Sequence, residues 1–164
     1  MKNKQNKNLE NLADNYSVLV DSIFRFIYFR TNNKGIAEDL TQDCFLSVVK
    51  YLKENNVDNI KAFLFKTARN KVIDYYRQKD RIIYSDDLVE TNDKGSSDNF
   101  SIQYDVRMIK EKLDLLESGD KEVLAMRYIE EMEIKEIALA IGKSETAARV
   151  KIFRALRKLR KLIK

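Results

Sequence analysis

The residues best placed to do chemistry in this sequence are cations, and they gather near its end. Between Ala147 and Lys164 there are eight lysine or arginine residues and no acidic residue. A short apolar-patterned segment, Ile134–Ile141, precedes them, and Gly142 lies in between. Glycine leaves helical geometry without steric cost, and Ser144 is a candidate N-cap for a second helix. The pattern is typical of a helix-turn-helix whose basic second helix enters the major groove of DNA.

The predicted second helix separates apolar side chains from charged ones. The face expected to pack against the domain consists of Ala148, Ile152, Ala155, Leu156 and Leu159. The opposite face consists of Val150, Lys151, Arg154, Arg157 and Lys161. The simpler interpretation is a solvated amphipathic helix with a basic face. The tight turn before it favours DNA binding, because an ordinary surface helix has no need of such a turn.

Composition limits the other kinds of site. The 164 residues carry a net charge of +5, which favours a polyanionic partner. There is no histidine and one cysteine, Cys44, so we expect no disulfide framework, no zinc site and no histidine-based active site. Cys44 lies on an apolar stripe and is predicted to pack rather than to act as a redox switch. Without a membrane-length apolar run or a signal-peptide core, the sequence predicts a cytoplasmic protein with no membrane insertion. We also expect no cofactor.

The apolar spacing predicts an all-α fold of two small helical domains joined by a flexible linker. There is no proline, and apolar residues recur at intervals of three and four through most of the sequence. Residues 85–103 hold five acidic residues and the run DKGSSDN, a composition typical of flexible linkers. We therefore expect domains at 9–84 and 104–164, the second one a helix-turn-helix domain. No further domain is expected before residue 9.

The first domain shows helical patterns at 9–30, 37–52 and 61–81. In the first pattern, the buried stripe is expected to comprise Leu12, Tyr16, Leu19, Val20, Ile23, Phe24 and Ile27. Gly35 is expected to break the chain before the second pattern. The outer face of that second helix consists of Asp39, Gln42, Asp43, Leu46 and Lys50. A leucine among carboxylates would suit a basic groove on another protein, although single exposed leucines are common.

The third pattern offers a second candidate nucleic-acid face. Its polar side consists of Lys66, Arg69, Asn70, Asp74 and Arg77, and such cationic and amide groups suit phosphates and bases. The polar segment 53–61 precedes it and could hold a displaced base, since unstacked bases are read on their edges and faces. An ordinary polar connection is the simpler alternative for that segment.

Three segments in this order and spacing resemble a bacterial RNA polymerase sigma factor of the sigma-70 family, in its extracytoplasmic-function (ECF) subgroup. They are AEDLTQDCFLSVVKYL, AFLFKTARNKVIDYYRQ and IKEIALAIGKSETAARVKIFRALRKLR. The resemblance covers about residues 10–84 and 108–162. It implies a bipartite adaptor with two partners, promoter DNA and core RNA polymerase, the latter contacted at the β′ clamp helices and the β flap. An anti-sigma factor commonly masks members of this subgroup, and the sequence neither indicates nor excludes one.

The resemblance also implies roles for individual residues. Docking on the polymerase would fall to Asp39, Gln42, Asp43 and Leu46. Recognition and opening of the −10 element would fall to Asn55, Asn56, Lys66, Arg69, Asn70, Asp74 and Arg77. Reading of the −35 element would fall to Arg149, Val150, Lys151, Phe153 and Arg154.

The recognition helix departs from the family pattern. Where the family often has G-T-V-[KR]-S-R, this sequence has TAARVK at residues 146–151. Ala147 and Val150 take the places of the usual threonine and serine, which removes two hydroxyl groups near the groove. Apolar contact with a thymine methyl could substitute for them, so we expect an unusual −35 preference.

The alternatives to a sigma factor are a stand-alone DNA-binding regulator and an enzyme. A stand-alone helix-turn-helix regulator would bind duplex DNA without polymerase and would use its first domain for dimerisation or sensing. An enzyme finds little support, because the sequence offers no histidine and no glycine-rich phosphate loop from which to draw a catalytic site.

Overall fold

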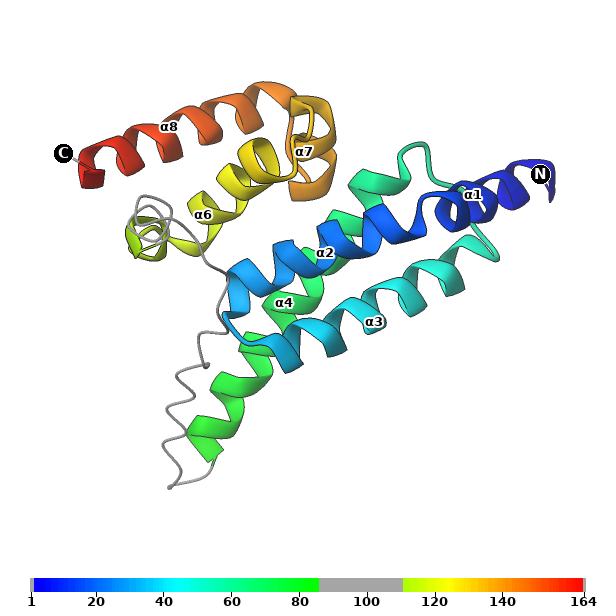
Figure 1. Ribbon diagram of the computed structural model, residues 1–164, viewed down its shortest axis with the longest axis horizontal. Coiled ribbons are helices and arrows are strands. Elements are labelled where there is room, and N and C mark those ends of the chain that lie inside the picture. The colour runs from blue at the N-terminus through cyan, green and yellow to red at the C-terminus, as the bar shows by residue number, and fades with distance from the viewer. Residues whose placement is uncertain (1, 86–110, 164) are drawn as a thin grey trace. The chain divides into compact units, whose positions relative to one another are not determined.

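The computed structural model of the protein describes residues 2–85 and 111–163. These residues form helices, turns and loops and contain no strand, which confirms the all-α prediction. The chain divides into two compact units, residues 1–95 and 96–164 (Figure 1). The linker predicted at 85–103 lies outside the described residues apart from Ser85, which ends a helix.

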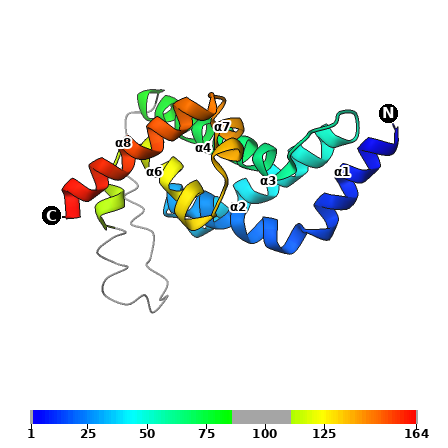
Figure 2. The ribbon, with the colours of Figure 1, turned by 90° about the horizontal axis from the view of Figure 1, so that it is seen from above.

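The N-terminal unit consists of α1 (Lys2–Asp14), α2 (Tyr16–Thr31), α3 (Lys34–Leu52) and α4 (Ile60–Ser85). Helices α2, α3 and α4 pack against one another, and α1 packs on α3 (Figure 2). The single helix predicted over residues 9–30 is wrong, because the chain breaks at Asn15. The side-chain amide and the backbone N–H of Asn15 both donate to the Asn11 carbonyl, at 2.9 and 3.2 Å, and such local side-chain bonds favour a turn over a continuous helix.

The core of this unit is apolar and closely packed. The rings of Phe26 and Phe65 meet edge to face at its centre, with 5.2 Å between centroids. Other fully buried apolar residues are Ile23, Ile27, Ala37, Cys44, Val48, Leu52, Leu64, Ala68 and Val72. Tyr16 was expected in the buried stripe, but it is 52% exposed. The break at Asn15 places Tyr16 in the first turn of a new helix, where its ring meets only the edge of the core at Phe45.

Asparagine, rather than the expected Gly35, sets the turn between α2 and α3. Asn32 adopts a left-handed conformation with φ of 51°, which ends α2. The Asn33 side chain then accepts a hydrogen bond from the Ile36 backbone N–H at 3.0 Å. This N-cap starts α3 at Lys34, three residues before the predicted start, and Gly35 lies within its first turn.

The C-terminal unit contains α6 (Ser118–Leu124), the π-helical turn η1 (Ala125–Ile129), α7 (Ile134–Ile141) and α8 (Glu145–Ile163). The predicted helix-turn-helix is confirmed in α7 and α8. Gly142 has φ of +67°, the left-handed conformation that glycine adopts without strain. The Ser144 hydroxyl accepts from the Ala147 N–H at 3.2 Å and caps α8. The buried face of α8 carries Ala148, Ile152 and Ala155, as predicted.

An ion pair ties α8 to α6. The Lys158 ammonium donates to the Asp120 carboxylate at 2.6 Å and lies 3.6 Å from a Glu117 carboxylate oxygen. Asp120 is buried, with 6% of its surface exposed. The hydrogen bond to Asp120 raises the pKa of Lys158, and the charges of both carboxylates add to the effect.

The single cysteine offers a test of the N-terminal core. Cys44 has no exposed surface, and burial raises the pKa of its thiol to about 12. At pH 8 we expect a thiol reagent to label the native protein at least about 10³-fold more slowly than the urea-unfolded chain, because labelling requires opening of the core. Fast labelling without urea, measured by the absorbance of the released chromophore, would contradict the packing role of Cys44.

The α6–α8 ion pair predicts how pH acts on the C-terminal unit. The pKa of Lys158 is higher in the folded state, so its contribution to stability is complete below its unfolded pKa and is lost as the pH rises through its folded pKa. Asp120→Asn should lower the free energy of unfolding at pH 7, and the gap from wild type should close at strongly alkaline pH. Urea titrations of the full chain between pH 7 and 12 measure this, because the folded pKa of Lys158 lies above 10.5. Glu131→Gln, an exposed substitution in the same unit, is the control, and a gap that is independent of pH would contradict the assignment.

Candidate nucleic-acid interface

The outer face of α8 is basic with an apolar centre. Arg149 and Arg154 are exposed, and between them lie Val150, 42% exposed, and Phe153, 65% exposed. Because α8 packs on α6 and α7 through its alanine-rich side, these four side chains are presented outward. Cations suit phosphate oxygens, while exposed apolar groups suit thymine methyl groups.

Lys151 departs from the predicted outward orientation. It is half-buried, and a Cβ built on Gly119 of α6 would lie 3.0 Å from the Lys151 Nζ. The lysine therefore lies against the first turn of α6, and a side chain at residue 119 would make its ammonium shift slightly. The sequence could not show this, because the relation joins residues from two separate helices.

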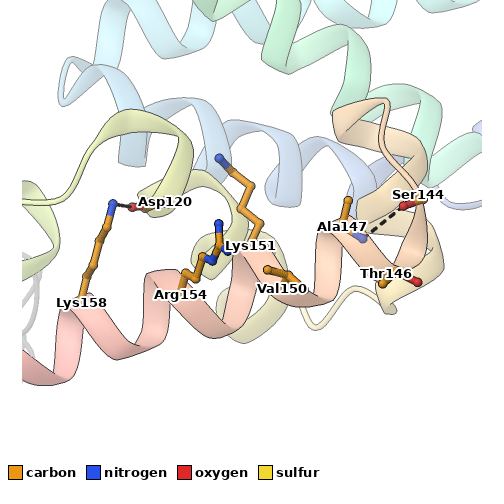
Figure 3. Close-up of a pocket in the computed structure, with 8 residues that line it drawn as sticks. All are labelled: Asp120, Ser144, Thr146, Ala147, Val150, Lys151, Arg154 and Lys158. Carbon is orange, nitrogen blue, oxygen red and sulfur yellow. Dashed lines mark hydrogen bonds and ion pairs between the residues drawn. The ribbon is translucent and has the colours of Figure 1, made fainter.

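An open pocket of about 700 Å³ lies along this side of α8 (Figure 3). Its lining consists of Asp120, Ser144, Thr146, Ala147, Val150, Lys151, Arg154 and Lys158. Three of these side chains are cationic and one is acidic, and the acidic one, Asp120, is paired with Lys158. The remaining positive charge of Lys151 and Arg154 makes the pocket favourable for an anion such as a DNA phosphate.

In the N-terminal unit, the predicted residues of α4 share one helix face but differ in exposure. Lys66, Asn70 and Arg77 are exposed, whereas Arg69 and Asp74 are half-buried. Asp74 forms an ion pair with Arg77 one turn away, which reduces the charge that Arg77 offers to a phosphate. Lys66 and Asn70 are therefore the exposed members of this set that do not share the Asp74–Arg77 ion pair.

The loop of residues 53–59 begins and ends with an asparagine cap. The backbone N–H and the side-chain amide of Asn55 both donate to the Tyr51 carbonyl, at 2.9 and 3.1 Å. The Asn59 side chain accepts from the Ala62 N–H at 2.8 Å and caps α4. The amide nitrogen of Asn55 is thus engaged in closing α3, while the neighbouring Asn56 is exposed.

The outer face of α3 is acidic with one large apolar residue. Asp39, Gln42 and Asp43 are exposed, and Leu46 among them is 69% exposed. Asp43 lies 4.0 Å from the Lys71 ammonium, and an exposed pair at that distance contributes little to stability. The face therefore remains negatively charged and is unsuited to DNA phosphates.

One residue that touches these elements, Asn8, has no signal in the sequence. The Asn8 side-chain amide donates to the Val57 carbonyl at 3.1 Å, linking α1 to the 53–59 loop. Periodicity cannot indicate such a bond, because 49 positions separate the two residues. In the described part of the chain, no cluster of histidine, cysteine and acidic residues could hold a metal ion, and no helix is long and apolar enough to cross a membrane.

Comparisons with known proteins match both units. Sigma-70 region 2 matches residues 16–82, and sigma-70 region 4 matches residues 107–159. The chain is 28% identical over 149 residues to the ECF RNA polymerase sigma factor SigM of Bacillus subtilis, covering 90% of this chain and 91% of that protein. It is 27% identical over 158 residues to the RNA polymerase sigma factor SigZ of the same organism, covering 95% of this chain and 87% of SigZ.

Among solved structures, the chain is similar in fold to the sigma factor RpoE of Bartonella quintana, which was crystallised with the anti-sigma factor NepR. The TM-score is 0.76 at 19% identity, covering 94% of this chain and 97% of RpoE. The two family regions occur here in order, and the helix-turn-helix lies within the second one. The chain therefore belongs to the sigma-70 family of RNA polymerase sigma factors, in its extracytoplasmic-function subgroup.

Proposed function

We propose that this alternative sigma factor contacts core RNA polymerase through the outer face of α3 and promoter DNA through α4, the 53–59 loop and α8. The observation that carries the proposal is a separation of charge between faces. The outer face of α3 presents Asp39, Asp43 and the exposed Leu46, whereas the outer face of α8 presents arginines. An acidic face repels phosphates, so it suits a protein partner, while the basic face suits DNA.

The two units would act at different parts of the promoter. We assign residues 9–84 to polymerase docking and to recognition and opening of the −10 element, and residues 104–164 to the −35 element. The segment 85–103 would act as a flexible linker. Binding of one unit would then raise the effective concentration of the other at its own site.

Two further points belong to the proposal. The protein would act in the cytoplasm as a binding protein rather than as an enzyme, with core polymerase supplying the chemistry of RNA synthesis. The Bartonella quintana sigma factor of similar fold was crystallised with an anti-sigma factor. A partner of that class, covering the α3 and α8 faces, would regulate this chain.

The docking face is tested by in vitro transcription with bacterial core polymerase on a pool of promoter fragments. Asp39→Ala/Asp43→Ala should lower sigma-dependent transcription at least about tenfold, because both carboxylates would face the polymerase. The exposed pair Asp14→Ala/Asp21→Ala removes the same charge from the same unit and should behave as wild type. Tight binding to duplex DNA without any polymerase-dependent transcript would make the protein a stand-alone regulator instead.

The apolar centre of α8 predicts a role for thymine methyl groups in −35 recognition. Replacing thymine by uracil in the −35 element of a promoter selected from the pool keeps base pairing but removes the methyl group. Holoenzyme binding should weaken about fourfold for each methyl group that Val150 contacts, the value expected for one buried methyl group. In Val150→Ser the same replacement should have a smaller effect. Equal sensitivity of the two proteins in a filter-binding assay would argue against this contact.

A further inference from the structure

We propose that α1 belongs to the promoter-opening machinery, with Asn8 as the residue that positions the 53–59 loop. This inference rests on the proposed function, in which that loop captures a base of the melted strand. Helix α1 ends at Asp14, before the start of the region 2 match at residue 16. Asn8 therefore lies outside the matched region, whereas Val57, which accepts its hydrogen bond, lies inside it.

Helix α1 is packed against the rest of the N-terminal unit, so Asn8 is held in a defined position. Leu12, one turn after Asn8, is only 4% exposed and packs into the N-terminal unit. Helix α1 packs along α3 and lies beside the loop that joins α3 to α4 (Figure 1). The Asn8 amide is partly buried and donates to the Val57 carbonyl at 3.1 Å, a distance typical of an N–H···O hydrogen bond.

The bond acts on the middle of the loop. Asn55 closes the loop at its start, through the Tyr51 carbonyl, and Asn59 closes it at its end, through the Ala62 N–H. Val57 lies between these two caps and follows the exposed Asn56 directly. A hydrogen bond to the Val57 carbonyl holds the peptide group between Val57 and Asp58, one residue after Asn56, and it thereby limits how the loop can present the Asn56 side chain.

Restriction of the loop matters for base capture. A base that leaves the duplex loses its stacking, and the protein must compensate with contacts that are ready when the base arrives. A loop already held in one conformation loses less conformational entropy on binding than a loop that must be ordered by the base. Asn8 is thus a positioning residue, acting on the DNA through Val57 and Asn56.

The test substitutes Asn8→Asp in the full chain. Aspartate has the same shape, but its carboxylate accepts hydrogen bonds only and cannot donate to the Val57 carbonyl. Asn11→Asp is the matched control, because it makes the same charge change at an exposed position of the same helix. Its carboxylate can still accept the hydrogen bond that Asn15 donates to Asn11. Asn8→Gln keeps a donor and should recover part of the wild-type behaviour.

Open-complex formation by holoenzyme is measured on a duplex promoter by permanganate reactivity of −10 thymines, and transcription is measured on a promoter premelted across the −10 element. Asn8→Asp should lower the yield on the duplex about fivefold, the effect of losing a hydrogen bond of about 1 kcal/mol. Its transcription from the premelted promoter should match wild type, because strand opening is no longer needed. Asn11→Asp should match wild type on both templates.

Three results would overturn the inference. Wild-type yield from Asn8→Asp on the duplex would show that the tether has no role in opening. An equal loss on duplex and premelted templates, or a lower melting temperature that accounts for it, would reduce Asn8 to a structural residue. Failure of the wild-type protein to direct any polymerase-dependent transcript would reject the proposed function itself, and the inference with it.

Discussion

Burial of an apolar stripe along α2, α3, α4 and α8 fixes the direction in which the other side chains of these helices point. In α3 the stripe contains Ala37, Cys44 and Val48, all without exposed surface. Once that side is buried, helix geometry leaves Asp39, Asp43 and Leu46 no orientation except outward. Turning the helix to cover Leu46 would bury the carboxylates without partners, which costs several kcal/mol for each one. The exposure of Leu46 on an acidic face thus follows from the packing of the opposite side of α3 alone.

Short polar side chains decide where these stripes begin and end. Asn33 and Asn59 cap α3 and α4, and Ser144 caps α8 after the left-handed Gly142. Each cap satisfies a backbone N–H that the helix leaves unpaired and typically contributes about 1 kcal/mol. The caps also set the direction of the chain between helices. The elements assigned to DNA are therefore positioned by such caps. The cap at Asn59 ends the 53–59 loop, and the cap at Ser144 starts α8.

Periodicity was sufficient to predict the main elements, the helix-turn-helix and the exposed face of α3, because these depend on spacing within one helix. It was wrong at Asn15, where the side chain and the backbone N–H share the Asn11 carbonyl, and at Tyr16, whose exposure follows from that break. It was also wrong for Lys151, whose long apolar stem lets the ammonium lie over Gly119 while the helical position faces partly outward. The Asn8 tether depends on chain segments that only the tertiary fold brings together.

Exposed cations occur along the whole of α8, including Arg157, Arg160 and Lys161, so its exposed apolar residues decide which part is expected to read bases. Toward its C-terminal end, Lys158 is held by Asp120 and Glu117, so much of its charge is already neutralised within the unit. Toward its N-terminal end, Arg149 and Arg154 are exposed on either side of Val150. The positive end of the helix dipole lies there too, although Glu145 in the first turn offsets part of it. A recognition helix that read bases through Val150 and Phe153 would therefore have cations on both sides of its apolar surface to contact phosphates.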